Sequence, residues 1–294
     1  MAPSSLQVYK RSWVLFLEAH NFLYQSDPPQ VTIPLTSQQA AIYVSYLHKE
    51  GYAPSSIVSY TSALGYIHRL RGYTDPTTAV LVQKLIAGAI KVTPPAPPRL
   101  PITLVILHRL LQAVDSHIKH YYHRSLLKAM FLISFYGLMR MGEVTMSKHG
   151  LVPLQMNQLQ ISQDKVIISI TQFKYNSKLT PVDIIFPRHQ DPQWCPVVHL
   201  STYLLLRGFK PGPIFSYPSL APIQRTFYSY KLNLLLKSIG CDVSRYQSHS
   251  FRIGGASYFA ELGYTDSQIR LLGRWETNSF IKYIRDIRAH KQSS

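Results

Sequence analysis

The chain has 294 residues, 46% of them hydrophobic, which is enough for two folded domains and excludes a disordered protein. Lys and Arg together number 31 against 14 Asp and Glu, giving a net charge of +17 at pH 7. Such an excess indicates a polyanionic partner, either nucleic acid or an acidic membrane surface. Two cysteines are too few for a disulfide scaffold or a cysteine-rich zinc module.

No apolar run in the sequence reaches the roughly 18 residues that a membrane-spanning helix needs. The longest candidate, residues 126–139, is too short and is interrupted by Lys128. The first residues also lack the apolar stretch of a secretory signal. We therefore expect an intracellular protein without a membrane partner.

A proline-rich segment divides the chain. Residues 92–101 contain five prolines, which cannot donate backbone hydrogen bonds and which favour extended chain. We predict a first domain over residues 1–92, a linker over 93–101 and a second domain over 102–294. Residues 1–98 hold seven bases and four acids, a net charge of +3, whereas the remaining residues hold 24 bases and ten acids, a net charge of +14. The second domain therefore carries most of the attraction for a polyanion.

The first domain is predicted to be entirely helical. Apolar residues at helical spacing indicate helices over residues 6–24, 37–49, 53–71 and 77–91. Thr36, followed three residues later by Gln39, predicts the N-cap of the second helix. Ser55 or Ser56 is expected to cap the third.

The second domain combines helices with one small sheet. Its predicted elements are helices at 103–113, 117–136 and 140–146, strands at 159–161, 165–171 and 182–186, and helices at 197–206, 223–239, 251–262, 266–273 and 279–289. The alternating strands are short and close in sequence, which favours antiparallel pairing. We predict a mainly α fold of two domains, the first helical and the second an α+β domain with a small antiparallel sheet.

The most informative segment is residues 248–257. His249 and Arg252 stand three residues apart at a predicted helix start, so both side chains lie on one side near the positive end of the helix. A guanidinium, an imidazole and free backbone N–H groups together make a site for a phosphate. On its own, such a pair is more often found on a solvated surface than in a phosphate site.

Further residues accompany this pair in a characteristic order. Arg140 and Glu143 lie upstream, Lys174 lies between the last two predicted strands, and Tyr283 follows Arg252 by 31 residues. With these motifs the chain resembles the tyrosine recombinases, also called phage-integrase-type recombinases, over essentially its whole length. The resemblance implies a helical core-binding domain of SAM-like fold and a catalytic domain, which together clamp double-stranded DNA.

The resemblance also implies roles for individual residues. The catalytic set that it assigns is Arg140, Lys174, His249, Arg252, Trp275 and Tyr283, with Glu143 in support. One extra residue separates Gly137 from Arg140 compared with the family's motif. Lys178 is a second candidate for the lysine of the hairpin.

One position of the family's pattern, occupied there by His or Trp, has two candidates. Trp275 is of the expected type and stands at the expected distance from Arg252, but it is one residue too close to Tyr283. Arg274 has the expected spacing to Tyr283. We expect Trp275 to fill the position, because its indole N–H can donate to a phosphate oxygen.

The expected chemistry follows from the residue types. Arginines stay charged and neutralise the non-bridging oxygens of a phosphodiester, whereas a tyrosine hydroxyl, with a pKa of about 10, needs a base or a positive field to become a nucleophile. The product would be a 3′-phosphotyrosine and a free 5′-hydroxyl, with Lys174 protonating the leaving oxygen. That linkage retains the bond energy, so we expect no cofactor and no metal.

Two other features have structural explanations. His117, His120 and His123 recur on a predicted helix, but no Cys or Asp completes a metal site, so we expect a basic face beside DNA. Cys195 is expected to be a buried, inert thiol.

We therefore expect a site-specific DNA recombinase that acts as a homo-oligomer, a tetramer on paired DNA sites. The ending around Gly273-Arg274-Trp275 and Tyr283 is similar to that of recombinases from eukaryotic mobile elements, the DIRS-type retrotransposons and Cryptons. The alternatives are a domesticated, non-cutting DNA-binding protein and an enzyme like the type IB topoisomerases. The protein would work in the nucleus of a eukaryote, or in the cytoplasm and nucleoid of a prokaryote.

Overall fold

The structure, a computed structural model, describes residues 3–24, 33–94, 97–146, 152–171, 173 and 180–284. The chain divides into two compact units, Met1–Ala96 and Pro97–Ser294. Each unit has a hydrophobic core of its own. The division falls within the proline-rich segment.

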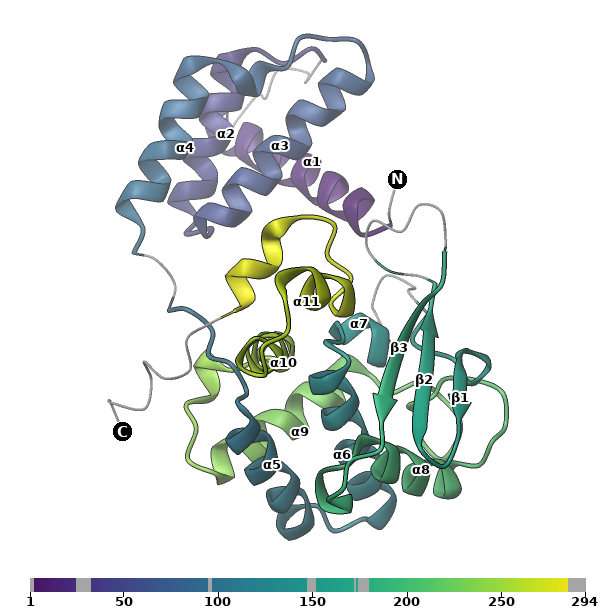
Figure 1. The fold of residues 1–294 in the computed structure, drawn as a ribbon. Coiled ribbons are helices and arrows are strands. Elements are labelled where there is room, and N and C mark those ends of the chain that lie inside the picture. Colours follow the sequence, from purple (N-terminus) through teal and green to yellow (C-terminus); the bar gives the residue numbers. More distant parts are fainter. Residues whose placement is uncertain are drawn as a thin grey trace. The chain divides into compact units, whose positions relative to one another are not determined.

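The described part of the first unit is helical (Figure 1). Its elements are α1 (Pro3–Tyr24), α2 (Ser37–Lys49), α3 (Pro54–Leu70), the 3-10 helix η1 (Pro76–Thr78) and α4 (Val80–Val92). Phe16 of α1, Tyr43 and Leu47 of α2 and Leu64 of α3 are almost completely buried and form the centre of this core. The four predicted helices are therefore confirmed.

One predicted helix cap and one predicted helix start in this unit are wrong. Thr36 and Gln39 do form a reciprocal capping box at α2. The helix α3, however, begins at Pro54 without any side-chain cap, so neither Ser55 nor Ser56 has the predicted role. Proline has no N–H to satisfy and a preset φ, which makes it a favourable first helical residue.

The fourth helix begins later than residue 77. Thr77 lies in η1, where its backbone N–H donates to the Asp75 carboxylate at 2.9 Å. This local Asp cap holds a separate 3-10 turn, and α4 starts only at Val80.

The second unit contains more elements than the first (Figure 1). In chain order they are α5 (Leu104–His117), α6 (Tyr121–Tyr136), α7 (Met141–Val144), η2 (Met156–Gln158), β1 (Leu159–Ile161), β2 (Lys165–Ile170), β3 (Val182–Pro187), η3 (Pro192–Trp194), α8 (Pro196–Arg207), α9 (Arg225–Ser238), η4 (Val243–Arg245), α10 (His249–Glu261), α11 (Asp266–Leu272) and η5 (Asn278–Tyr283).

The sheet of this unit is antiparallel, with β2 between β1 and β3. Ile168 of β2 stands opposite Leu159 of β1 and Ile184 of β3. Val166, Ile168 and Ile170 are buried because side chains alternate between the two faces of a strand and these three face the core. All three predicted strands, and the small antiparallel sheet, are confirmed.

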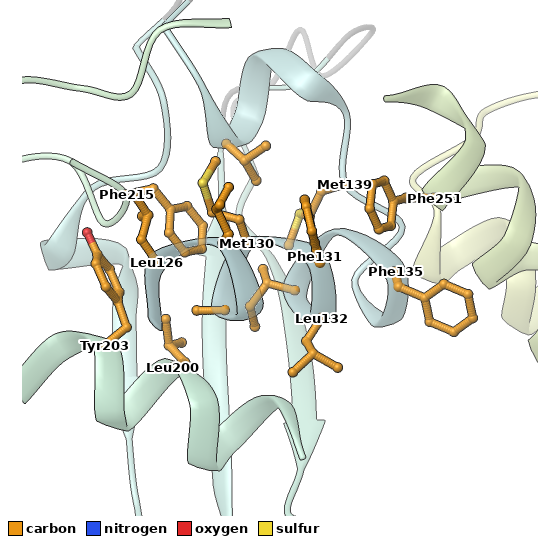
Figure 2. Packing of buried hydrophobic residues seen from close by; sticks show 14 of the residues in the cluster. Leu126, Met130, Phe131, Leu132, Phe135, Met139, Leu200, Tyr203, Phe215 and Phe251 are labelled. Atoms are coloured by element: carbon orange, nitrogen blue, oxygen red, sulfur yellow. The ribbon is translucent and has the colours of Figure 1, made fainter. Parts of the chain in front are cut away.

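The centre of the second unit is α6. Eleven of its 16 residues are buried, as expected for a helix that is apolar on every side. Figure 2 shows Met130 and Phe131 of α6 among side chains from several other segments, including Leu200 of α8 and Phe251 of α10. The rigid packing of α6 therefore supports both the sheet and the start of α10.

One predicted helix, over residues 117–136, is interrupted. His117 is the last residue of α5, and α6 begins at Tyr121. Ile118 between them has an extended backbone and is only 4% exposed, so the chain leaves the helix to bury this side chain. As a result, His117, His120 and His123 do not share one helix, which corrects that prediction.

The described end of the chain is a 3-10 helix. The predicted helix over 279–289 corresponds to η5 as far as Tyr283, and residues beyond 284 lie outside the described part. Within the residues that the structure describes, none of the helices has both the length and the apolar character required to cross a membrane.

Candidate active site

The start of α10 is held close to two other segments. A Cβ atom on Gly254 would lie 1.8 Å from the carbonyl oxygen of Ile102, and one on Gly255 would lie 2.3 Å from that of Phe135. Only glycine permits this approach. The contact sets the first turn of α10, which carries His249 and Arg252, against the end of α6.

Arg252 is almost completely buried, with an exposed fraction of 1%. Its guanidinium donates hydrogen bonds to the carbonyl oxygens of Leu138 and Gly273. It also lies over the indole of Trp275, with 4.0 Å between the guanidinium carbon and the ring centroid. Burial, together with the positive charges of Arg140 and Arg274, lowers the pKa of Arg252 well below its usual value.

Glu143 of α7 lies between two arginines. Its Oε1 accepts from Arg140 at 3.1 Å, its Oε2 accepts from Arg274 at 2.8 Å, and the backbone N–H of Arg140 adds a further bond of 2.8 Å. Burial raises the pKa of this carboxyl, but the two guanidinium groups and the N–H lower it by more. Glu143 is therefore ionised and holds Arg140 in place.

Arg274 and Trp275, the two candidates for one position, occupy different environments. The side chain of Arg274 has an exposed fraction of 0% and faces Glu143. The ring of Trp275 lies against that of Tyr283 at a tilt of 45°, with 5.2 Å between ring centroids. The structure thus brings Trp275, and not Arg274, against the tyrosine.

Tyr283 and His249 are in direct contact. The tyrosine hydroxyl lies 2.7 Å from Nε2 of His249. Burial and the nearby charges of Arg252, Arg99 and Arg140 lower the pKa of His249 to about 4. At neutral pH the imidazole is therefore uncharged and has one nitrogen that can accept a proton.

A small separate cluster positions the tyrosine. Phe280 of η5 is 2% exposed and packs with Trp275 and Leu138. The backbone carbonyl of Tyr283 accepts from Oγ of Ser257 in α10 at 3.1 Å. Because this hydrogen bond ties η5 to α10, the hydroxyl of Tyr283 faces His249 of α10.

Sequence reasoning missed the backbone acceptors and one arginine. Leu138, at φ 47°, and Arg274, at φ 55°, are non-glycine residues in the left-handed region, and the strained turn at Leu138 aims its carbonyl at Arg252. In the sequence, the glycines that precede them, Gly137 and Gly273, are the only local sign of a turn at these two positions. Arg99, an exposed residue of the predicted linker, contributes to the lowered pKa of His249.

Some predicted site residues cannot be placed. Lys174 and Lys178 lie outside the described residues. Among the residues that are described, no three His, Cys, Asp or Glu side chains are grouped to hold a metal ion. Cys195 is buried, and its sulfur accepts from the backbone N–H of His189 at 3.2 Å.

The arrangement has a clear chemical character. Among the described residues, the carboxylate of Glu143 pairs with Arg140 and Arg274, and its charge also acts on the nearby Arg252. Three guanidinium groups and one carboxylate leave these four side chains with a net positive charge. A tyrosine hydroxyl with a neutral imidazole beside it borders this charge. Such a site can bind an anion and bring a nucleophile to it.

No protein-family model matches the sequence, and no curated protein matches it significantly. Solved structures do match it. The site-specific recombinase XerH, in a post-cleavage complex with its palindromic difH substrate, aligns with a TM-score of 0.68 at 12% identity, over 98% of this chain and 78% of that one. The Tn1549 transposon integrase in complex with transposon right end DNA aligns with a TM-score of 0.62 at 12% identity, over 99% of both chains.

A lambda integrase dimer bound to a core site also matches, with a TM-score of 0.56 at 15% identity, over 95% of this chain and 72% of that one. These likenesses extend over nearly all of the chain, across both compact units. The chain therefore has the mainly helical fold of the tyrosine recombinases, with its small antiparallel sheet in the second unit.

Proposed function

We propose that this protein is a tyrosine site-specific recombinase, which cleaves and rejoins DNA through a 3′-phosphotyrosine intermediate. The observation that carries the proposal is the hydroxyl of Tyr283, 2.7 Å from Nε2 of His249 and beside a cluster of buried arginines. A buried excess of guanidinium groups is costly unless an anion offsets it. A DNA phosphodiester supplies such an anion.

In the proposed cleavage step, Arg140 and Arg252 neutralise the non-bridging oxygens of the scissile phosphate. The Tyr283 hydroxyl gives its proton to Nε2 of His249, which is neutral because of its lowered pKa of about 4. The phenolate oxygen forms a bond to phosphorus while the bond from phosphorus to the 5′ oxygen breaks. The departing oxygen takes a proton from Lys174, a role that rests on the resemblance to the family.

Rejoining is the reverse of this step. A 5′-hydroxyl gives its proton to Lys174 while its oxygen forms a bond to phosphorus. The bond from phosphorus to the Tyr283 oxygen breaks, and that oxygen recovers its proton from His249. The phosphotyrosine retains the energy of the original phosphodiester, so neither strand transfer requires a nucleotide cofactor.

The proposed partner is double-stranded DNA, bound by four copies of the chain on paired sites. The net charge of +14 in residues 99–294 supports the DNA partner. One structural neighbour is a lambda integrase tetramer bound to a Holliday junction, at a TM-score of 0.56 and 15% identity. We also propose an origin in a eukaryotic mobile element of DIRS or Crypton type, which rests on the motif of Gly273-Arg274-Trp275 and Tyr283 alone. The protein would then act in the nucleus.

The test is a search for covalent protein–DNA adducts on denaturing gels. Nicked duplexes tiled across DNA that flanks the gene trap the intermediate, because the short cleaved strand diffuses away. We expect an adduct with the wild type and none with Tyr283→Phe, while both bind the duplex equally. The matched control is Tyr264→Phe, a partly exposed tyrosine with no role in the proposal, which should still give the adduct.

Other outcomes identify other functions. Tight, salt-sensitive binding without any adduct would indicate a non-cutting DNA-binding protein. Relaxation of supercoiled plasmid by a monomer, without exchange of strands, would indicate a topoisomerase. An adduct formed by Tyr283→Phe would remove this tyrosine from the reaction.

A further inference from the structure

Arg274 offers no terminal N–H group to a ligand. A guanidinium has two N–H groups on each terminal nitrogen and one on Nε. In Arg274, Nη1 donates to the carbonyls of Gly137 at 3.2 Å and Leu272 at 3.1 Å, while Nη2 donates to the carbonyl of Leu138 at 3.3 Å and to Glu143 at 2.8 Å. The side chain is 0% exposed, and its Nε, which has no hydrogen-bond partner, is buried as well. Both terminal nitrogens of Arg274 therefore donate to groups inside the protein.

The other two arginines of the site differ in this respect. Arg252 uses one N–H of each terminal nitrogen for the carbonyls of Leu138 and Gly273, so three of its N–H groups take no part in these bonds. Arg140 bonds to Glu143 and to the carbonyl of Arg274, and its side chain is 26% exposed. These two arginines keep donors for a phosphate, whereas the terminal nitrogens of Arg274 are already bonded and its unpaired Nε–H is buried.

Arg274 also connects with both of those arginines. The Leu138 carbonyl that it binds is the acceptor of Arg252 too, and the Glu143 carboxylate that it binds is the partner of Arg140. Its own carbonyl accepts from Arg140 at 3.3 Å. The left-handed backbone at Leu138 and Arg274, at φ 47° and 55°, is strained for non-glycine residues and needs such tertiary contacts to persist.

We propose that Arg274 is a positioning residue, a buried counterion of Glu143 that holds the carboxylate and the Leu138 carbonyl where they aim Arg140 and Arg252 at the scissile phosphate. This inference rests on the proposed recombinase function. It assigns Arg274 a role without any contact to DNA.

The test compares two kinds of DNA. In one, the scissile phosphate is unmodified; in the other, a methylphosphonate replaces one charged non-bridging oxygen with a neutral methyl group. If an arginine contacts the phosphate, its loss should slow adduct formation less on the methylphosphonate than on unmodified DNA, because the charge that it neutralises is absent. An arginine that acts through Glu143 is needed equally for both substrates.

We expect Arg274→Met to slow adduct formation roughly 10- to 100-fold on unmodified DNA, the usual effect of losing an indirect support. The methylphosphonate should not restore the rate. Arg140→Met is the comparison variant, and here the methylphosphonate should restore much of the loss. Arg270→Met, an exposed arginine of α11, is the control that should react like the wild type.

Equal rescue of Arg274→Met and Arg140→Met by methylphosphonate would show a direct phosphate contact and overturn the inference. An unchanged rate for Arg274→Met on unmodified DNA would overturn it as well. If Arg274→Met does not fold, Arg274→Lys keeps the buried charge without the planar fork, and the same two criteria apply to it. Absence of an adduct from the wild type would instead contradict the proposed recombinase function.

Discussion

At the scale of single residues, the site is governed by an imbalance of charge. In the described part of the site, Glu143 pairs with Arg140 and Arg274, and its charge also acts on Arg252, which is 1% exposed. Burying guanidinium groups costs several kcal/mol each unless partners offset the loss of water. Backbone carbonyls offset part of this cost for Arg252. The remaining positive charge prepares the site for an anion before any ligand binds.

His249 makes a residue-scale prediction about pH. Its pKa is about 4 in the folded chain, against 6.5 for an unperturbed histidine. Between these pH values the unfolded chain binds more protons than the folded one, so the free energy of unfolding contributed by His249 falls as the pH is lowered from 6.5 to 4. His249→Gln should therefore weaken the dependence of stability on pH in this window.

Urea unfolding at a series of pH values measures this dependence. His48→Gln, an exposed histidine at the end of α2, serves as the control and should leave the slope as it is in the wild type. A slope unchanged by His249→Gln would contradict the burial of a neutral imidazole at this position.

At the scale of elements, α10 depends on its two glycines. Gly254→Ala would place a methyl group 1.8 Å from the Ile102 carbonyl oxygen, which backbone cannot tolerate without moving. We expect a loss of stability of about 1–3 kcal/mol, as in other overpacked sites, and a slower reaction because the first turn of α10 carries His249 and Arg252.

The matched control is Gly88→Ala in α4, where an added Cβ meets nothing within 4 Å. That substitution should stabilise the chain by about 0.5–1 kcal/mol through helix propensity alone. Denaturant unfolding of both variants gives the comparison. A Gly254→Ala variant as stable as Gly88→Ala would show that the close approach of α10 is not needed.

At the scale of the whole molecule, the charge excess predicts how DNA binding responds to salt. Each phosphate that Lys or Arg neutralises releases counterions, so affinity should fall about 10³-fold between 50 and 200 mM salt if about six phosphates are contacted. Fluorescence anisotropy of a labelled duplex measures this slope. A flat response would count against a DNA partner despite the net charge of +17.

Much of the fold could be predicted from local patterns. The strands at 159–161, 165–171 and 182–186 and the capping box at Thr36 agree with the structure because neighbouring residues determine them. The interrupted helix at Ile118 could not be predicted in this way. The helix breaks there because the side chain of Ile118 is buried in a core that segments distant in sequence build. The spacing of apolar residues along the chain does not show that this burial stabilises the break.

The chemical groups available to the site follow from the sequence, because the types and order of Arg140, His249, Arg252 and Tyr283 can be read along the chain. The tertiary structure added that Trp275 lies against Tyr283 while Arg274 is buried against Glu143, and it supplied the carbonyl of Leu138 as an acceptor. The reason is physical: every residue has a carbonyl, so no pattern of side chains marks the one that a distant guanidinium will bind. Burial, too, depends on the packing of segments far apart in sequence, which spacing along the chain does not encode.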